Sequence, residues 1–228
     1  MSLTVYAPAS MGNVGVGFDL LGAALAPIDG SLLGDRVTIA AADAGVSLTQ
    51  VGAWAHKLPS NPEENIVHQC AVFFLKALGK ENQGVALTLE KNLPVGSGLG
   101  SSASSVVAAL YALNEHFERP YDKQALLELM GEFEGKISGS VHYDNVAPCY
   151  LGGMQLMLNV PGAICEAIPS FKQWYWVVAY PGISLSTAMM RKLMPEQYDK
   201  SVAIDFGRYL SAFVHASYQQ NAKLAIQV

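Results

Sequence analysis

Several stretches of the chain alternate apolar and polar residues, and this period of two predicts β-strands. Residues 84–90 are the clearest case, because Val85, Leu87 and Leu89 fall on one face. Two later stretches are short apolar runs next to turn-forming residues, which also suits strands. The predicted strands cover residues 3–9, 35–41, 84–90, 153–158 and 174–180.

Other stretches repeat apolar residues every three or four positions, which predicts helices. Asn61 and Pro62 favour a helix start, since Asn caps free N–H groups and Pro fits the first turn. Asp122 is a second predicted cap. The predicted helices run from Asn61 to Gly79, from the region after residue 102 to Phe117, from Asp122 to about Ile137, and over 186–193 and 204–226. The mixture of neighbouring strands and separate helices favours an α+β fold over strict βαβ alternation.

Composition narrows the class of protein. Hydrophobic residues make up 51% of the 228 residues, which is enough for a sizeable core, and the net charge of −5 argues against a nucleic-acid or anionic-membrane binder. The mean hydropathy is +0.24, but the longest apolar runs fall short of the roughly 18 residues that cross a bilayer. The N-terminus has neither the basic nor the apolar region of a secretory signal.

Cys70, Cys149 and Cys165 are widely spaced and odd in number, so we expect reduced core thiols in a cytoplasmic protein.

Residues 96–102 (GSGLGSS) form a glycine-rich loop directly before a predicted helix. Such a loop lets backbone N–H groups face an anion, and the helix N-terminus adds free donors and a positive dipole end. The loop lacks the lysine of a Walker A motif, and Ser101 replaces the third glycine of the dinucleotide fingerprint. The pattern therefore predicts a phosphate cradle of another kind, with a flexible strand-to-helix turn as the alternative.

Glu134 occupies an unexpected position on the helix that starts at Asp122. At about 100° per residue, it falls within about 40° of Met130, on the apolar side that also carries Phe133. Glu128 and Glu132 fall on the opposite side, where solvated carboxylates belong. A carboxylate that faces the core is costly unless it is paired or binds a metal. Three readings stay open: a pair with Lys or Arg, a side chain that reaches solvent at the helix end, or a Mg²⁺ ligand near the phosphate loop.

Residues 140–145 (SVHYDN) follow that helix, and alternate residues of an extended segment share a face, so His142 and Asp144 can point together. A hydrolase reading would make Ser140 or Ser102 a nucleophile beside them, but the chain has no G-x-S-x-G elbow there. The plain alternative is a satisfied polar turn. Residues 13–19 form another glycine-punctuated loop, which in isolation would be read as a turn.

Together these motifs resemble the GHMP small-molecule kinases, over nearly the whole chain. The segment 93–104 (LPVGSGLGSSAS) resembles the ATP-phosphate motif of that family. Three further segments resemble the branch of the family that acts on homoserine: 7–22 (APASMGNVGVGFDLLG), 134–148 (EGKISGSVHYDNVAP) and 180–191 (YPGISLSTAMMR). The resemblance implies a domain like domain 2 of ribosomal protein S5 over residues 1–160, followed by an incomplete ferredoxin-like domain over 161–228. The boundary itself rests on the Pro/Gly break at 159–162.

The resemblance implies transfer of the γ-phosphate of ATP to the side-chain hydroxyl of L-homoserine, with Mg²⁺, to give O-phospho-L-homoserine for threonine synthesis. It also allows a homodimer. The implied nucleotide site comprises Asn65, Lys91, Pro94, Val95, Gly96, Ser97, Gly98, Leu99, Gly100, Ser101 and Ser102. The implied metal ligands are Ser102 and Glu134, the implied substrate residues are Asn13, Asp19, His142, Asp144 and Arg191, and the implied catalytic residues are Asn145, Asp144 and Glu134.

The charges of the substrate agree with these roles. Homoserine is a zwitterion, so Arg191 offers a bidentate partner for its carboxylate, and Asp19 or Asp144 offers a charge for its ammonium group. Phosphoryl transfer depends mainly on positioning and charge neutralisation, which favours direct in-line transfer. A general-base role for Asp144 is the alternative.

The sequence departs from the family at its C-terminal side. It has no G-x-S-G-S-G-P-T motif, and the second substrate-site arginine of the homoserine branch has no counterpart. We therefore expect one whole domain and the start of another, with exposed apolar side chains in 174–193 and 204–226. Two alternatives follow: a nucleotide-binding remnant without activity, or a kinase for another small alcohol.

Overall fold

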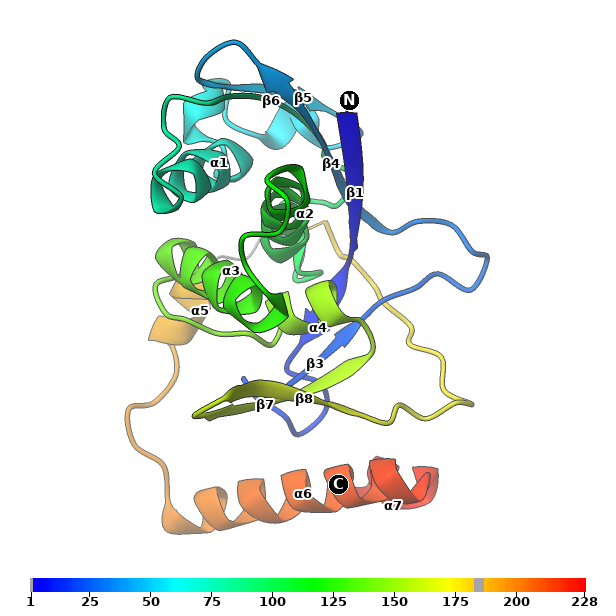
Figure 1. Cartoon of the computed structure of the whole chain (residues 1–228). Coiled ribbons are helices and arrows are strands. Elements are labelled where there is room, and N and C mark those ends of the chain that lie inside the picture. Colours follow the sequence, from blue (N-terminus) through cyan, green and yellow to red (C-terminus); the bar gives the residue numbers. More distant parts are fainter. Residues whose placement is uncertain (1, 183–186) are drawn as a thin grey trace.

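The computed structural model describes residues 2–182 and 187–228, and their strands form two four-stranded sheets (Figure 1). The first sheet has the order β1 (Ser2–Pro8), β4 (Gly34–Ala42), β6 (Gly84–Glu90), β5 (Val46–Val51). Its pairs are antiparallel except for β5 and β6, which are parallel. The second sheet is antiparallel, in the order β2 (Ser10–Gly12), β3 (Leu21–Ala24), β7 (Met154–Val160), β8 (Ala163–Ile168).

Helices separate and cover the two sheets. Figure 1 shows α1 and α2 against the first sheet, α3 and α4 between α2 and the second sheet, and α6 along the outer side of the second sheet. The helices are α1 (Ile66–Ala77), α2 (Ser101–His116), α3 (Lys123–Ser138), α4 (Val146–Leu151), α5 (Thr187–Lys192), α6 (Lys200–Gln219) and α7 (Ala222–Gln227), with 3₁₀ turns at η1 (Ala55–Lys57) and η2 (Pro62–Glu64). No helix in the described part of the chain is long and apolar enough to cross a membrane.

Helix α2 forms the centre of the main core. Its buried residues are mostly small, such as Ala103, Ala108 and Ala112, so the helix packs closely against β1, β4, α1 and α3. Larger side chains, Phe74 of α1 and Leu110 of α2 among them, are fully buried. Burying each of these contributes roughly 1.5–3 kcal/mol relative to exposure. The N-terminus of α2, where the glycine loop ends, is therefore carried by a helix that is buried in the main core.

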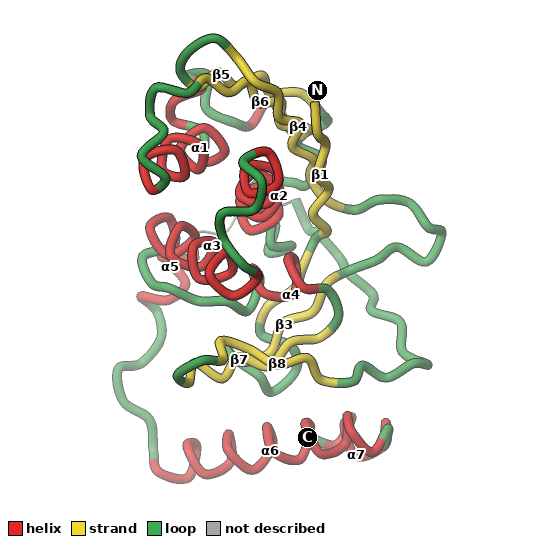
Figure 2. The backbone as a smooth tube through the Cα atoms, in the orientation of Figure 1, coloured by secondary structure: helices red, strands yellow, loops and turns green. Residues whose placement is uncertain are grey.

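The predicted α+β class is confirmed, as are four of the five predicted strands. The fifth prediction, a strand over 174–180, is wrong: this segment pairs with no strand of the described chain, and Figure 2 shows it as loop. Val177 is 96% exposed there. An apolar run becomes a strand only where a neighbouring strand satisfies its backbone groups, and no strand of the described residues does so here.

Two predicted helices differ in their bounds. Asn61 caps only the short η2 turn, because Asn65 has an extended backbone (φ −76°, ψ 136°) and its own side chain caps α1 at the N–H of Val67. The predicted helix over 204–226 is divided by Gln220, whose φ of 52° ends α6 before α7 begins. The periodicity did not reveal the shorter elements, β2, β3, β5, β8 and α4.

The predicted domain boundary falls within the second sheet. Residues 161–162 make the turn that joins β7 to β8, and Val160 pairs with Ala163 across it. The division into 1–160 and 161–228 stays a prediction. Residues 183–186 of the 180–191 motif lie outside the described residues.

Candidate active site

A cavity of about 600 Å³ opens where the glycine loop, the end of α3 and the turn before α4 meet. It brings together most residues that the sequence singled out, from segments far apart in the chain. The predicted residues that line it are Asn13, Asn65, Lys91, Val95, Gly96, Ser97, Gly98, Gly100, Ser101, Ser102, Glu134, His142, Asp144 and Asn145. Pro94 and Leu99 belong to the loop without lining the cavity, and Asp19 and Arg191 pair with each other instead.

The glycine loop has the backbone conformation that the phosphate prediction requires. Gly96, Gly98 and Gly100 all have positive φ angles, of 69°, 75° and 61°, a region that glycine enters without strain. Gly100 caps α2, and as a glycine it has no side chain to occupy the first N–H groups of that helix. A Cβ atom at Gly100 would lie 2.1 Å from Oγ of Ser10, so only glycine fits there. The N-terminus of α2 thus presents backbone donors to the cavity, an arrangement that favours anions.

Glu134 is buried and lies against the glycine loop, as its place on the apolar face of α3 indicated. Its Oε1 accepts a hydrogen bond of 2.6 Å from Oγ of Ser102. Burial raises the pKa of Glu134, an effect that the Ser102 hydrogen bond opposes and the nearby Asp144 reinforces. Ionising this carboxylate therefore costs free energy in the folded protein, which a cation at this place would offset.

Ser102 and Glu134 are the two residues that the family resemblance implies as Mg²⁺ ligands. The described residues contain no cluster of three or more His, Cys, Asp or Glu side chains that could hold a metal alone. Mg²⁺ is usually held by one or two carboxylates together with phosphate oxygens and water. Ser102 and Glu134 supply two hard oxygen donors beside a phosphate-type loop, so they fit an ion of that kind.

The turn before α4 places Asp144 and Asn145 at the wall of the cavity. Asp144 is only 3% exposed, and burial raises its pKa, with the charge of Asp19 acting in the same direction. Oδ1 of Asn145 accepts a hydrogen bond of 3.1 Å from Oγ of Ser10. Ser10 is fully buried, and its backbone N–H donates to the carbonyl of Leu99. Ser10 therefore joins Asn145 to the glycine loop.

Two glycines allow this turn to approach the second sheet. A Cβ at Gly12 would lie 2.0 Å from Oδ2 of Asp144 and 2.7 Å from Nδ2 of Asn145. A Cβ at Gly22 would lie 1.7 Å from the carbonyl oxygen of Asp144. The glycines of the 7–22 motif thus make room for the turn at 144–145, a contact that the motif alone did not reveal.

Asp19 and Arg191 form a two-point ion pair, with Nη2 to Oδ1 at 2.6 Å and Nη1 to Oδ2 at 2.9 Å. Asp19 has a left-handed backbone (φ 57°), and its N–H donates to Oδ1 of Asn13 at 2.8 Å. The neighbour of Arg191, Met190, lines the cavity, as does Asn13. The predicted substrate residues are therefore close to the cavity, with their opposite charges paired.

The geometry disfavours the hydrolase reading. The hydroxyl of Ser102 donates to Glu134, and Oγ of Ser140 lies 3.2 Å from Nδ1 of His142. Among the described residues, no hydrogen bond joins His142 to Asp144, so a Ser–His–Asp relay does not form. A serine placed on Nδ1 also occupies the nitrogen that an orienting carboxylate would use.

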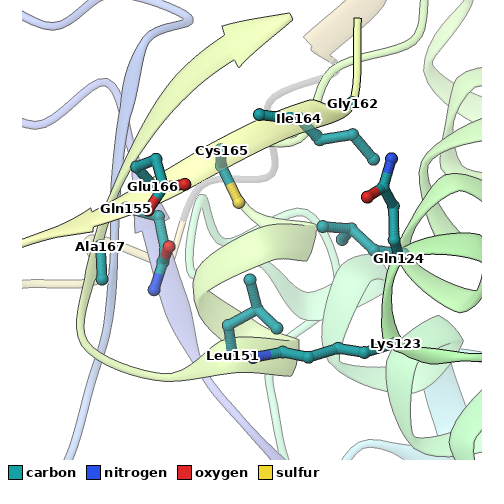
Figure 3. A pocket seen from close by; sticks show the side chains of 11 residues that line it. Lys123, Gln124, Leu151, Gln155, Gly162, Ile164, Cys165, Glu166 and Ala167 are labelled. Atoms are coloured by element: carbon teal, nitrogen blue, oxygen red, sulfur yellow. The ribbon is translucent and has the colours of Figure 1, made fainter.

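A second cavity, of about 380 Å³, lies between the start of α3, the end of α4 and the β7–β8 hairpin (Figure 3). None of the predicted site residues lines it. The thiol of Cys165 points into it, and burial raises the pKa of that thiol. All three cysteines are free, and Cys70 and Cys149 are buried, as expected for core thiols.

Sequence reasoning missed a buried polar group beneath the loop. Asp35, at the start of β4, is 0% exposed and accepts a hydrogen bond of 2.5 Å from Nζ of Lys91. The sequence offered little sign of it, because an acidic residue at the start of a strand is usually exposed. Asn65, a predicted nucleotide residue, is also 0% exposed, and its side chain caps α1 and donates to Gln50.

Comparison with known proteins identifies a family and a fold that this chain shares. The model of the GHMP kinases N terminal domain matches residues 65–153. The crystal structure of a homoserine kinase from Cytophaga hutchinsonii is 32% identical, with a TM-score of 0.83, over 99% of this chain and 70% of that one. A putative homoserine kinase from Listeria monocytogenes (21% identity, TM-score 0.68) and L. major mevalonate kinase in complex with R-mevalonate (19%, 0.69) each match over 99% of this chain and 72% of theirs. These last two share the fold.

Proposed function

The chain belongs to the GHMP kinase family of small-molecule kinases, and we propose that it transfers the γ-phosphoryl group of ATP to the side-chain hydroxyl of L-homoserine. One observation carries the choice of substrate. The cavity that holds the glycine loop also adjoins a paired acid and base, Asp19 and Arg191. These two charges suit an amino-acid zwitterion. Mevalonate carries a carboxylate but no ammonium group, so it matches Arg191 and leaves Asp19 without a partner charge.

In this proposal the glycine loop holds the triphosphate. Backbone N–H groups at the start of α2 face the phosphate oxygens, where the helix dipole favours negative charge. Ser102 and Glu134 are the groups that would hold Mg²⁺, which supplies charge neutralisation on the phosphates when it is bound. The hydrogen bond between these two side chains keeps both oxygens directed to one point beside the loop.

The amino-acid end of the substrate lies toward Asn13, Asp19, His142, Asp144 and Arg191. Arg191 takes the carboxylate with its two guanidinium nitrogens, and Asp19 takes the ammonium group. The backbone N–H of Asp19 donates to Asn13, and its carboxylate accepts from Arg191, so main chain and side chain are both ordered before the substrate binds. The substrate hydroxyl then lies beside Asn145, next to the glycine loop.

The chemical step is direct in-line transfer, in which the chain's residues position the hydroxyl and neutralise charge. Asn145 orients the substrate hydroxyl. Its own side chain is fixed at both ends, because Oδ1 of Asn145 accepts from Ser10 and Nδ2 of Asn145 donates to Asp144. A buried Asp144 with a raised pKa could also accept the hydroxyl proton. The Asp144→Asn variant separates the two roles: lost turnover with both substrates still bound indicates a base, and lost homoserine affinity alone indicates a binding group.

The test is ADP release from ATP by the purified chain, with L-homoserine and, in parallel, with mevalonate, L-serine or no acceptor. Homoserine-dependent ADP release that exceeds release with the other acceptors supports the proposal. Preference for another alcohol would replace homoserine with that substrate. The chain could instead bind ATP without releasing ADP, while a C-terminally extended version does release ADP. That result would favour the nucleotide-binding remnant.

A further inference from the structure

The glycine loop rests on a buried ion pair that the proposed reaction does not use. Asp35 and Lys91 have side chains that are 0% and 3% exposed, and Nζ of Lys91 lies 2.5 Å from Oδ2 of Asp35. The ammonium group also donates to the carbonyl of Ser101 at 2.7 Å and to Oγ of Ser105 at 3.0 Å. Three donors thus meet three acceptors, so the ammonium is fully occupied beneath the loop.

The same pair fixes both ends of the loop. At the entrance, the N–H groups of Asn92 and Leu93 donate to Oδ1 of Asp35, at 2.9 and 3.1 Å. At the exit, the carbonyl of Ser101 accepts from Lys91. The two ends also meet directly, since Oγ of Ser101 donates to the carbonyl of Leu93 at 3.4 Å. One ion pair therefore sets the distance between the residues where the loop begins and ends.

A loop of this composition needs such an anchor. Three of its glycines have positive φ angles, and glycine loses more conformational freedom on ordering than any other residue. Fixing both ends on a desolvated ion pair reduces the number of conformations that the free loop can reach. A buried pair of this kind adds little to stability by itself, but it can define one geometry.

We propose that Asp35 and Lys91 are positioning residues that close the ends of the glycine loop and so hold its N–H groups in register for the phosphates of the nucleotide. This inference rests on the proposed function for the identity of the ligand. It gives Lys91 a different role from a contact with the nucleotide base. Loss of the pair weakens binding of phosphates and leaves binding of the nucleoside unchanged.

The experiment measures the affinities of ATP and adenosine by titration calorimetry for the wild type and for Lys91→Met. We expect ATP affinity to fall at least tenfold and adenosine affinity to stay within twofold. Equal losses for both ligands would indicate a base contact or general damage, and unchanged ATP affinity would remove the role altogether. Either result overturns the proposal.

Two control variants keep the test specific. Arg36→Met removes an exposed ion pair with Glu90 between the same two strands, and both affinities should stay at wild-type values. Phe74→Leu loosens the core of α1, and it should lower the melting temperature with no change in the ratio of the two affinities. A shift of that ratio in Phe74→Leu would show that instability alone produces the effect and would contradict the proposal.

If Lys91→Met does not fold, the affinities of ATP and adenosine are compared in the same way for Ser105→Ala and for the double variant Asp35→Asn/Lys91→Met. The double variant leaves no unpaired buried charge, so its stability recovers while its ATP affinity stays low. Hydrogen exchange of the backbone amides in residues 92–101 tests the role of the pair without nucleotide. Exchange should become faster when the pair is removed, and an unchanged exchange rate overturns the proposal that the pair holds the loop ends. If the wild type binds no ATP, the proposed function fails, and the exchange rates still test the role of the pair.

Discussion

The guanidinium of Arg191 meets the carboxylate of Asp19 at two points, although the two residues are 172 positions apart in the chain. Their side chains are 28% and 32% exposed, so the pair is open to solvent on one side. A zwitterion carries the same two charges and can replace each partner with its own group. The pair holds both side chains in place, and in the proposed function it favours a ligand that offers an anion and a cation together.

Removal of Arg191 should weaken the amino-acid substrate selectively. Charge-assisted hydrogen bonds contribute about 1.5–3 kcal/mol, so Arg191→Met should reduce L-homoserine affinity about 10- to 100-fold and leave ATP affinity within twofold. Calorimetric titration of both ligands measures this. Arg208→Met removes an exposed pair with Asp205 on α6 and should change neither. A homoserine affinity within twofold of wild type would show that the guanidinium does not bind the carboxylate.

The sequence revealed what depends on local spacing. The turn of the glycine loop into a helix, the apolar face that carries Glu134 and the cap at Asp122 are all patterns within a few residues, and the structure has each of them where it was predicted. Asn61 does cap a helical turn, but only the short η2 turn, because Asn65 starts α1. Helix α2 then places the loop, because the small buried residues behind it allow close packing against its neighbours.

Relationships between distant residues did not follow from the pattern. Nothing near Asp35 indicates that the strand start is buried beneath a loop more than fifty residues later, and the contact of Gly22 with Asp144 depends on how two motifs fold together. The strand predicted over 174–180 failed for a related reason. Its residues suit a strand, but pairing depends on a neighbour, which the local sequence does not describe.

Glu134→Gln should stabilise the fold while it removes the proposed metal ligand. Burial raises the pKa of Glu134 above its ordinary value of 4.5, so the folded state holds the proton more tightly than the unfolded state does. Stability is then fully present below pH 4.5 and is lost as the pH rises through the folded pKa. The neutral glutamine avoids this loss, and it can still accept the Ser102 hydrogen bond.

The measurement is thermal melting of wild type and Glu134→Gln from pH 4 to pH 8. We expect the variant to melt several degrees higher at pH 8, with a difference that shrinks toward pH 4. Mg²⁺ should strengthen ATP binding in the wild type and have little effect in the variant. Glu128→Gln, on the exposed face of α3, serves as the control. A variant that melts lower than wild type at pH 8 would contradict the burial argument.

Alanine at the two glycines under the 144–145 turn should have different effects. At Gly12 the added Cβ meets side-chain atoms of Asp144 and Asn145, which can move aside. Gly12→Ala should therefore fold, with homoserine affinity reduced at least tenfold. At Gly22 the added Cβ meets the backbone carbonyl of Asp144. Gly22→Ala should therefore lower the free energy of unfolding, since overpacking typically costs about 1–3 kcal/mol.

Chemical denaturation and homoserine titration of both variants test this difference. Gly207→Ala is the matched control, because it lies in α6 with nothing within 4 Å of the added Cβ. It should keep wild-type affinity and gain slightly in stability from helix propensity. If Gly12→Ala binds homoserine as well as Gly207→Ala does, the turn at 144–145 is not part of the substrate site.

The 228-residue chain should associate in solution through its C-terminal third. Val177, Tyr175 and Leu193 are 96%, 78% and 77% exposed, and exposed apolar clusters promote association or aggregation. Val177→Lys should shift the mass measured by size exclusion with light scattering toward the monomer. Ile28→Lys is the control: Ile28 is 87% exposed but lies in the loop after β3, outside the C-terminal third of the chain, and its replacement should leave the mass unchanged. A wild-type chain that stays a monodisperse monomer across concentrations, with a cooperative melt, would show that these side chains do not drive association.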